Sequence, residues 1–515
     1  MRLPWVLPVV LLGLLLGLST LAYPWTDWDT PSATYLGQVV LEGGAPYREA
    51  WNVKAPGVYF AYALSILLSG KSALGIRIFD LLWQCATALV LAGAGARMFR
   101  SERAGLFAGF GYLLVYYSQN YWNWAEADGL ISLPLAAGFL FLLRGMESDR
   151  GRDWGLAAFW VGLAALFKLI FGFVGVAMLA AAFVKPPAWR GLLLRRVAPL
   201  AVGVSLPLLA TAAYLRSHGA LDEFLLTQFV VAPELTGRLR ALVHAGCIVK
   251  SLVRPVLLPL YIVFFLAVYS LGRTLRRRME WRVPAVFCGA WFLTGALTLV
   301  LHGAYFGYHF LPLFAPLAVL AGSAFETITD KLWPLKLSRK SLLALAGLGL
   351  LCLMPVVKLG QRAYFSWQVL SGRAPAVAWR ELGTYLRERT KPDDQIFVWG
   401  NVPALYLYAE RRSCSRFIFS YFLSLQWKRV NYQPAFLAEL RAGKPRYFVL
   451  IKEGKPNACS GHEIGALEAF ERFSELKQIV AGEYETEKET VDYIVYRRRT
   501  EKASEERGRD AAPGT

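Results

Sequence analysis

The sequence predicts an α-helical membrane protein with many transmembrane helices, followed by a small C-terminal α/β domain. Hydrophobic residues make up 56% of the 515 residues, a larger share than ordinary soluble domains contain. Apolar runs of about 18 residues or more recur along residues 1–358, and runs of that length cross a bilayer core roughly 30 Å thick. Residues 359–499 are polar and alternate between strand-like and helix-like segments.

The apolar runs predict about eleven transmembrane helices. They cover residues 4–22, 74–96, 104–121, 129–143, 155–168, 170–184, 197–215, 252–271, 283–301, 310–325 and 342–358. The first run has the composition of a signal peptide, with one basic residue before an apolar core. Because many further runs follow it, we expect an uncleaved membrane helix instead.

The distribution of basic residues predicts the orientation in the membrane. The net charge is +19, and Lys and Arg gather in alternate loops, for example in residues 273–282. Cytoplasmic loops of membrane proteins carry such an excess, so we expect the N-terminus inside. The acidic loop 23–60 and everything after residue 358 would then lie outside. Since membrane topology accounts for the positive charge, we expect no nucleic-acid partner.

Two apolar segments of the first outer loop are too short or too interrupted to cross the membrane. Residues 30–43 and 57–70 are therefore expected to form helices that lie on the outer membrane surface. Pro31 suits the first turn of the earlier helix, and Asp29 or Thr30 would cap it.

Residues 359–499 form the predicted outer α/β domain, and the charged tail 500–515 is expected to be disordered. The chain would thus divide into residues 1–358, 359–499 and 500–515. Predicted strands of the outer domain cover residues 393–400, 415–420, 445–452 and 490–498, and predicted helices cover residues 403–411, 433–443 and 463–476.

The six cysteines are scattered and show no metal-binding spacing, so no zinc site is expected. Cys414 and Cys459 both fall in the C-terminal domain. A disulfide between them and two free thiols are both consistent with the sequence.

Two carboxylates follow the first apolar run directly. Asp27 and Asp29 could act as a general base, or could stabilise an oxocarbenium ion, at the outer membrane face. The structural alternative is a helix cap in a solvated loop. Asp29 has the better position for chemistry.

Three cations could bind a phosphate at the same face. Lys54 stands beside an X-Pro bond, which holds the backbone extended and can fix the direction of the ammonium group. Arg77 and Lys168 lie near the outer ends of apolar runs, where ionisable residues are costly and tend to be functional. The alternative for all three is a side chain that reaches along the membrane toward the headgroups.

A second acidic loop lies between two apolar runs on the outer side. Glu126 and Asp128 stand beside Trp124, and carboxylates next to an indole ring suit a sugar. The alternative is an aromatic belt with two loop acids. His309, before a later apolar run, could contact a lipid phosphate or substrate hydroxyls, or could simply flank a helix.

In order and spacing, these motifs resemble the GT-C superfamily of polyprenyl-phosphate-dependent glycosyltransferases. The resemblance is strongest to bacterial relatives of protein O-mannosyltransferases (glycosyltransferase family 39), with the lipid A aminoarabinose transferase as a cousin. It covers about residues 5–325, and Glu49 and Ala55 depart from the usual residues. The matching segments are Asp29 to Tyr35, Gly43-Gly44-Ala45-Pro46-Tyr47, Lys54-Ala55-Pro56, Leu74-Gly75-Ile76-Arg77, Glu126 with Asp128, Lys168, and His309-Phe310-Leu311-Pro312.

The resemblance implies an inverting glycosyltransferase in a bacterial plasma membrane, with its active site and C-terminal domain on the extracytoplasmic side. Its donor would be a sugar on polyprenyl phosphate, and its acceptor a lipid, glycan or protein hydroxyl. Neither a metal nor another cofactor is expected, and membrane lipids would surround the chain. The implied catalytic residue is Asp29, with Asp27 as the other candidate; the implied donor-phosphate ligands are Lys54, Arg77 and Lys168; and the implied substrate-binding residues are Glu126, Asp128, Tyr35, Tyr47, Trp124 and His309.

Two other functions are compatible with many membrane helices. One is a transporter or flippase of a lipid-linked glycan precursor, and the other is a non-catalytic assembly protein of the same fold. A transporter would place ionisable residues near the middle of the membrane, in two matching halves. The acidic residues of this sequence cluster in outer loops instead, which favours the enzyme.

Overall fold

The computed structural model describes residues 6–25, 27–242, 245–276, 279–303, 305–332, 339–371, 373, 378–452 and 464–499. The chain forms two compact units, each assembled from separate parts of the sequence. The first contains residues 1–24, 54–214 and 243–374, and the second contains residues 25–53, 215–242 and 375–515. The predicted disordered tail 500–515 lies outside the described residues.

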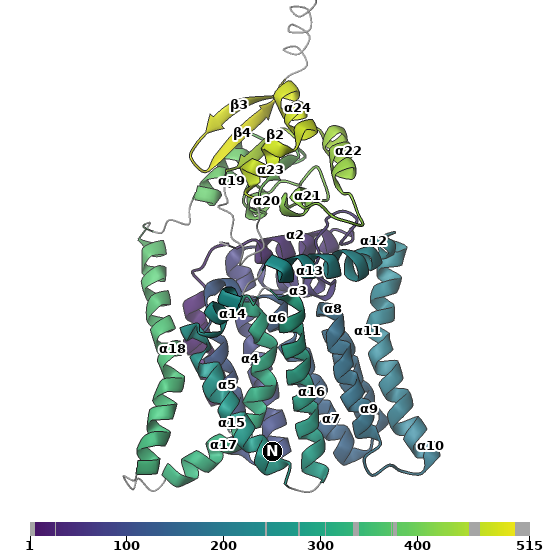
Figure 1. The fold of residues 1–515 in the computed structure, drawn as a ribbon, viewed down its shortest axis with the longest axis vertical. Helices are drawn as coiled ribbons and strands as arrows, with labels where there is room; N and C mark the ends of the chain where they lie inside the picture. The colour runs from purple at the N-terminus through teal and green to yellow at the C-terminus, as the bar shows by residue number, and fades with distance from the viewer. Residues whose placement is uncertain are drawn as a thin grey trace, which may run out of the picture. The chain divides into compact units, whose positions relative to one another are not determined.

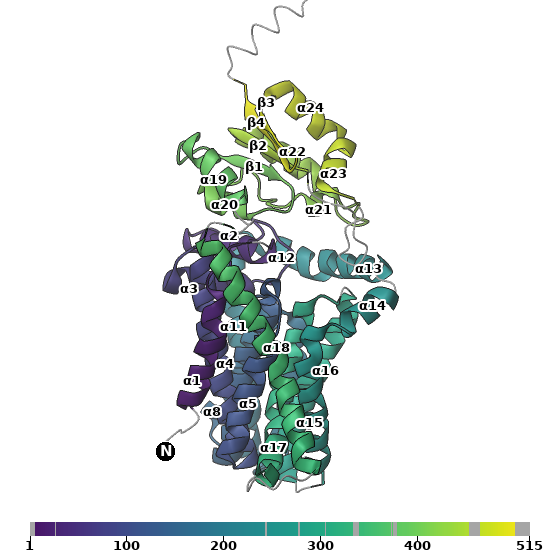
Figure 2. The ribbon, with the colours of Figure 1, turned by 90° about the vertical axis from the view of Figure 1, so that its left-hand side faces the viewer.

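The first unit is a bundle of helices. In Figure 1 the long helices α4, α5, α15, α16 and α17 run side by side along it. Figure 2 shows α18 crossing the side of the bundle formed by α5 and α15. The α-helices are α1 (Val6–Gly17), α3 (Gly57–Ser69), α4 (Ala73–Phe99), α5 (Glu102–Tyr116), α6 (Ala127–Leu130), α7 (Ser132–Ser148), α8 (Gly151–Phe167), α9 (Val174–Ala182), α10 (Trp189–Leu192), α11 (Ala198–Ser217), α14 (Ala245–Leu252), α15 (Leu258–Thr274), α16 (Met279–His302), α17 (Phe314–Leu332) and α18 (Arg339–Leu370).

Short turns of 3-10 or π helix connect or continue these helices. They are η1 (Leu18–Thr20), η2 (Tyr121–Asn123), η3 (Leu169–Phe173), η4 (Leu193–Val197), η6 (Pro255–Leu257) and η7 (Gly307–Leu313).

Small residues let the central helices approach closely. A Cβ atom at Gly105 of α5 would lie 2.4 Å from the carbonyl oxygen of Ala92 in α4. A Cβ atom at Gly322 of α17 would lie 2.3 Å from the carbonyl oxygen of Ala104 in α5. Apolar helices in lipid associate largely through such close packing, so these glycines fix α5 between α4 and α17.

Six helical stretches are long and apolar enough to cross a membrane: residues 73–99, 127–148, 189–217, 282–302, 307–330 and 345–369. Shorter apolar helices cover residues 6–20, 57–69, 169–182 and 258–274. Each of the predicted transmembrane segments coincides with helix in the structure. The number of helices that cross the membrane stays a prediction. The last predicted segment ends at residue 358, whereas α18 continues to Leu370, because no helix-breaking signal intervenes.

The second unit contains a four-stranded sheet in the order β1-β2-β4-β3. Strands β1 and β2 pair in parallel, whereas β2 with β4 and β3 with β4 are antiparallel. Figure 2 shows α19 and α20 on one side of the sheet and α22, α23 and α24 on the other. The strands are β1 (Ile396–Trp399), β2 (Tyr447–Ile451), β3 (Tyr484–Glu489) and β4 (Tyr493–Arg498).

The helices of the second unit come from all three parts of the chain that build it. They are α2 (Asp29–Leu41), α12 (Leu221–Leu226), η5 (Thr227–Val231), α13 (Ala232–Leu242), α19 (Ala378–Glu388), α20 (Ala404–Ala409), α21 (Tyr421–Ser424), α22 (Gln433–Gly443), α23 (Ala466–Arg472) and α24 (Ser474–Glu483).

The predicted fold class, a helical membrane protein with a small sheet domain, is confirmed. Strands are found in the predicted segments 393–400, 445–452 and 490–498, but the strand predicted for residues 415–420 is wrong. In that segment Phe417 forms only an isolated bridge with Trp51. The backbone N–H of Trp51 donates to the backbone carbonyl of Arg416.

Strand β3 was not predicted, because its sequence Tyr484–Glu489 is charged and lacks apolar alternation. Charged side chains are typical of an edge strand. The helix predicted for residues 463–476 is two helices, α23 and α24, with Phe473 between them. Helices α2 and α3 confirm the two helices predicted for residues 30–43 and 57–70.

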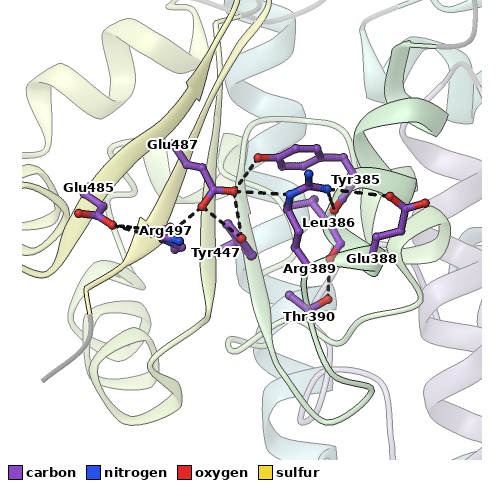
Figure 3. A network of polar contacts seen from close by, with 9 residues as sticks. All are labelled: Tyr385, Leu386, Glu388, Arg389, Thr390, Tyr447, Glu485, Glu487 and Arg497. Atoms are coloured by element: carbon purple, nitrogen blue, oxygen red, sulfur yellow. Dashed lines mark hydrogen bonds and ion pairs between the residues drawn. The ribbon is translucent and has the colours of Figure 1, made fainter.

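Glu487 organises the contacts between β3, β2 and α19 (Figure 3). It lies at a register shift between Thr486 and Lys488, so it is the extra residue of a β-bulge. Its carboxylate accepts hydrogen bonds from the Tyr385 hydroxyl at 2.6 Å and the Tyr447 hydroxyl at 3.1 Å. Arg497 Nε lies 3.2 Å from the other carboxylate oxygen. This network joins α19 to the sheet.

Candidate functional site

The first unit holds its acidic loop in a defined conformation. Glu126 stands at the N-cap position of α6, and Asp128 follows in the first turn of that helix. Both residues are 2% exposed. Carboxylates as buried as these require a positive partner or hydrogen bonds to remain ionised, and the structure provides a lysine for each.

Lys54 is the partner of Glu126. Its ammonium nitrogen lies 2.9 Å from Glu126 Oε2, and the lysine side chain keeps 20% of its surface exposed. The backbone carbonyl of Lys54 accepts a hydrogen bond from the Tyr59 hydroxyl of α3 at 2.9 Å. The lysine is therefore fixed at both its backbone and its charged end.

Lys168 is the partner of Asp128. Its ammonium nitrogen lies 2.5 Å from Asp128 Oδ1, and its side chain is 16% exposed. Lys168 directly follows α8, where the chain turns to extended backbone with φ −150° and ψ 116°. This change of direction leads the chain from α8 into η3.

The two ion pairs connect residues that the sequence assigned to different roles. Lys54 and Lys168 were predicted to bind the donor phosphate, and Glu126 and Asp128 to bind substrate. The structure brings them together in pairs. Because an ammonium group has three N–H donors, each lysine can retain its carboxylate and still donate to a phosphate oxygen.

Arg77 and Trp124 form a second contact near the acidic loop. Arg77 of α4 is 2% exposed, and its guanidinium donates to the backbone carbonyl of Trp124 at 3.4 Å. Arg77 and Arg362 lie 5.8 Å and 4.8 Å from the centre of the Trp124 ring. The indole is 1% exposed, so it is packed against cations and presents no open face to a sugar in this structure.

His309 lies in η7 and is 4% exposed. Its ring centre is 4.8 Å from that of His302 and 4.5 Å from that of Tyr308. The imidazole is therefore part of an aromatic cluster at the junction of α16 and α17.

The second unit contains both candidate bases. Asp27 Oδ1 accepts the backbone N–H of Thr30 at 2.7 Å, and Asp27 Oδ2 accepts the Thr30 hydroxyl at 2.9 Å. Asp29 is the first residue of α2, and Pro31 lies in the first turn. The prediction that Asp29 or Thr30 caps this helix is wrong. The helix already begins at Asp29, and the carboxylate of Asp27 accepts a backbone N–H of its first turn, that of Thr30.

Tyr35 and Tyr47 belong to the core of the second unit. Tyr35 is 3% exposed, and its hydroxyl accepts the backbone N–H of Ser413 at 3.0 Å; burial raises the pKa of its phenol. Tyr47 is fully buried, adopts φ +74° and packs on Phe224. Both phenols serve packing in this structure, and their contact with substrate stays a prediction.

Two buried charged residues were missed in the sequence. Asp80 of α4 is 3% exposed and Arg362 of α18 is 1% exposed. Ionisable residues inside apolar helices are rare and usually have a function, so the charge of Asp80 within the apolar run 74–96 was a usable signal. Arg362 lies beyond the last predicted run, which ends at residue 358, and gave no such signal. Their contacts are described below.

The described residues include a free thiol at Cys414 and contain no cluster of side chains that could bind a metal. Cys414 is a free thiol, so it is not bonded to Cys459, which lies outside the described residues. No group of three or more His, Cys, Asp and Glu side chains in the described part of the chain could hold a metal ion. That the protein works without a metal stays an expectation.

The sequence model of one protein family and several solved structures match the chain. The sequence model of the family described as dolichyl-phosphate-mannose-protein mannosyltransferase matches residues 53–214. That range contains Lys54, Arg77, Glu126, Asp128 and Lys168. No curated protein matches the chain.

Several solved structures share the fold. ArnT from Cupriavidus metallidurans, bound to undecaprenyl phosphate, is 14% identical with a TM-score of 0.60, over 96% of this chain and 98% of that one. The Archaeoglobus fulgidus oligosaccharyltransferase is also 14% identical, with a TM-score of 0.52 over 87% of this chain and 70% of that one. The mycobacterial arabinofuranosyltransferase AftD has 14% identity and a TM-score of 0.50, over 97% of this chain and 40% of its own. At these levels of identity, the similarities show that the chain shares the fold of these proteins.

Proposed function

We propose that the chain is an inverting glycosyltransferase that moves a sugar from a polyprenyl-phosphate donor to an acceptor hydroxyl at the extracytoplasmic face of a bacterial plasma membrane. The observation that carries the proposal is the pairing of Lys54 with Glu126 and of Lys168 with Asp128 on one short loop. Undecaprenyl phosphate in the ArnT structure and dolichol phosphate in an archaeal oligosaccharyltransferase structure support this class of donor.

The lysines would bind and stabilise the leaving phosphate. In the proposed reaction, negative charge builds up on the phosphate oxygen as the bond to the sugar breaks. Cations that are already held in place stabilise such charge without reorganisation. Glu126 and Asp128 would fix the direction of the Lys54 and Lys168 ammonium groups, and Arg77 would add a third cation.

Asp29 would act as the general base. Its carboxylate takes the proton of the acceptor hydroxyl, and the hydroxyl oxygen forms a bond to the anomeric carbon. The bond between that carbon and the phosphate oxygen breaks, and polyprenyl phosphate leaves. Attack opposite the leaving group inverts the anomeric configuration. Asp27 is the other candidate, and both of its carboxylate oxygens accept hydrogen bonds at the start of α2.

The substrate-binding roles of Glu126, Asp128 and His309 belong to the same proposal. Trp124, Tyr35 and Tyr47 are buried, so a sugar would reach them only if neighbouring side chains moved. The sugar itself and the acceptor are left to the assay below.

The test is release of polyprenyl phosphate by the purified full-length protein, supplied with a panel of radiolabelled polyprenyl-phosphate sugars and acceptors. We expect release from one donor, and loss of release in Asp29→Asn. Asp27→Asn is the matched control and should retain most activity, because its amide oxygen can still accept the backbone N–H of Thr30 and its NH2 group can donate to the Thr30 hydroxyl. Equal release by wild type and Asp29→Asn would overturn the assignment of the base. Donor movement across vesicles without any release would favour the transporter.

A further inference from the structure

Ala125 has an unusual backbone conformation directly before the acidic loop. Its φ is +61°, in the left-handed region that side chains other than glycine rarely adopt. Such a conformation is unfavourable and persists only where the surroundings impose it. Ala125 precedes Glu126, so its conformation sets the direction in which the loop presents Glu126 and Asp128.

Side chains from two helices bond the two backbone polar groups of this residue. The Tyr62 hydroxyl of α3 donates to the carbonyl of Ala125 at 2.8 Å. The Tyr116 hydroxyl of α5 accepts the backbone N–H of Ala125 at 3.3 Å. Because Ala125 is 2% exposed, water cannot easily replace these partners, and losing either would leave a buried backbone group unpaired.

Asp80 fixes the orientation of the Tyr116 hydroxyl. That hydroxyl lies 2.8 Å and 3.0 Å from the two carboxylate oxygens of Asp80 and donates its proton there. Its lone pairs are then directed away from Asp80 and are available to the N–H of Ala125. Gln84 donates to the same carboxylate at 2.9 Å. The chain of contacts therefore runs from Asp80 through Tyr116 to the backbone of the loop.

We propose that Asp80 and Tyr116 are positioning residues, which hold Ala125 in its left-handed conformation and so align Glu126 and Asp128 with Lys54 and Lys168. The catalytic part of this inference rests on the proposed transferase function. Neither residue touches the lysines in any contact described above, so each acts through the loop. A misplacement of about 1 Å in a catalytic group can lower a rate by about 100-fold, which explains why such an anchor would matter.

The test compares Tyr116→Phe with Tyr112→Phe. Both phenols are fully buried on α5, but the Tyr112 hydroxyl bonds Gln84 at 2.6 Å and does not reach the loop. In the full-length protein we expect Tyr116→Phe to speed hydrogen exchange of the Ala125 amide and to lower kcat about 10-fold or more. KM for the donor should change little. Tyr112→Phe should show much smaller effects, because Tyr112 is linked to the loop only indirectly, through Gln84 and Asp80.

Two further variants probe the same contacts. Tyr62→Phe removes the bond to the Ala125 carbonyl and should act in the same direction, which keeps the test open if Tyr116→Phe fails to fold. Asp80→Asn should also lower kcat. The double variant Asp80→Asn/Tyr116→Phe should be no slower than the slower single variant, because the two residues act in series.

The outcomes separate this inference from the proposed function. Full kcat in Tyr116→Phe and Tyr62→Phe, or equal losses in Tyr116→Phe and Tyr112→Phe, would overturn the positioning role. If the kcat losses of Asp80→Asn and Tyr116→Phe multiplied in the double variant, the two residues would act independently. That result would overturn the positioning role of Asp80. If the wild type releases polyprenyl phosphate from no donor, the proposed function fails. Hydrogen exchange of the Ala125 amide, compared between the wild type and Tyr116→Phe, would then still show whether Tyr116 anchors the loop.

Discussion

Lys54 and Glu126, which are 72 positions apart in the sequence, meet with 2.9 Å between Nζ and Oε2. Glu126 is almost fully buried, whereas Lys54 keeps a fifth of its side-chain surface exposed. The lysine therefore compensates a buried negative charge and remains accessible from one side. Under the proposed function, the exposed side of Lys54 would contact the donor phosphate while its other side pairs with Glu126.

Lys54→Met should destabilise the protein by about 3 kcal/mol, because it leaves the carboxylate of Glu126 buried without its lysine. Glu126→Gln should be milder, since the amide oxygen can still accept from Lys54. In the double variant part of the loss should be recovered, with a coupling of about 1 to 3 kcal/mol. Thermal unfolding in detergent measures all three. Lys71→Met, at an exposed loop lysine, is the control and should leave the unfolding temperature unchanged. Losses of stability from Lys54→Met and Glu126→Gln that simply added in the double variant would contradict the pairing.

Lys168→Met should reduce turnover by about 100-fold or more, since in the proposed mechanism it removes a donor that stabilises the leaving phosphate. Lys168→Arg keeps the positive charge but not the geometry of an ammonium group. Its turnover should therefore lie between that of the wild type and that of Lys168→Met. Steady-state rates of polyprenyl phosphate release measure the effect. A variant without the lysine that turned over at the wild-type rate would remove Lys168 from the site.

Asp27→Ala should lower the stability of the protein by about 1 kcal/mol, because α2 loses the carboxylate that bonds the backbone N–H and hydroxyl of Thr30. Turnover should fall far less than in Asp29→Asn. The measurement is thermal unfolding together with the release assay. If Asp27→Ala abolished turnover at unchanged stability, Asp27 and not Asp29 would be the base.

Arg362→Met should destabilise the first unit by about 2 to 3 kcal/mol, because buried acceptors lose their donor. The guanidinium donates to the Leu16 carbonyl at 3.1 Å and also to the carbonyl of Tyr117, which ties α18 to α1 and to the end of α5. Arg373→Met is the control on the same part of the chain, because Arg373 is exposed and its guanidinium stacks on Trp367. Equal effects of the two changes on the unfolding temperature would show that the buried contacts contribute nothing.

The second unit should lose stability at alkaline pH through Tyr385. Burial, and then the hydrogen bond and charge of Glu487, raise the pKa of this phenol to about 12. Because the pKa is higher in the folded state, the folded state favours the protonated phenol. The resulting stability is complete below about pH 10, the ordinary pKa of tyrosine, and is lost as the pH rises toward 12.

Titration of tyrosinate absorbance, with unfolding followed at the same pH values, measures this loss. Glu487→Gln should move the Tyr385 pKa downward, since it removes the neighbouring negative charge. Glu485→Gln is the matched control: Glu485 also pairs with Arg497, at 2.6 Å, but has no contact with Tyr385 among those drawn in Figure 3. An identical alkaline transition in both variants would contradict the role of Glu487.

Long apolar runs and strand-like segments allowed the fold class to be predicted from the sequence, because both reflect local periodicity. Helices such as α4 and α22 and strands such as β2 lie where their own side chains predict them. Strand β3 and the false strand at residues 415–420 were not predictable in this way. Pairing with β4 makes Tyr484–Glu489 a strand. In the other segment the backbone groups bond separate partners, such as the N–H of Trp51 at Arg416 and the side chain of Glu439, instead of a neighbouring strand.

The sequence by itself determined which residues could carry the chemistry, since charge next to apolar runs is costly and visible in one dimension. It identified Lys54, Lys168, Glu126 and Asp128, but not that they form two pairs. Only the tertiary structure decided the pairing, gave Asp27 its place at the start of α2, and brought Asp80 and Tyr116 to the backbone of Ala125. These contacts join residues whose positions are set by helix packing, and packing depends on the whole unit rather than on any one segment.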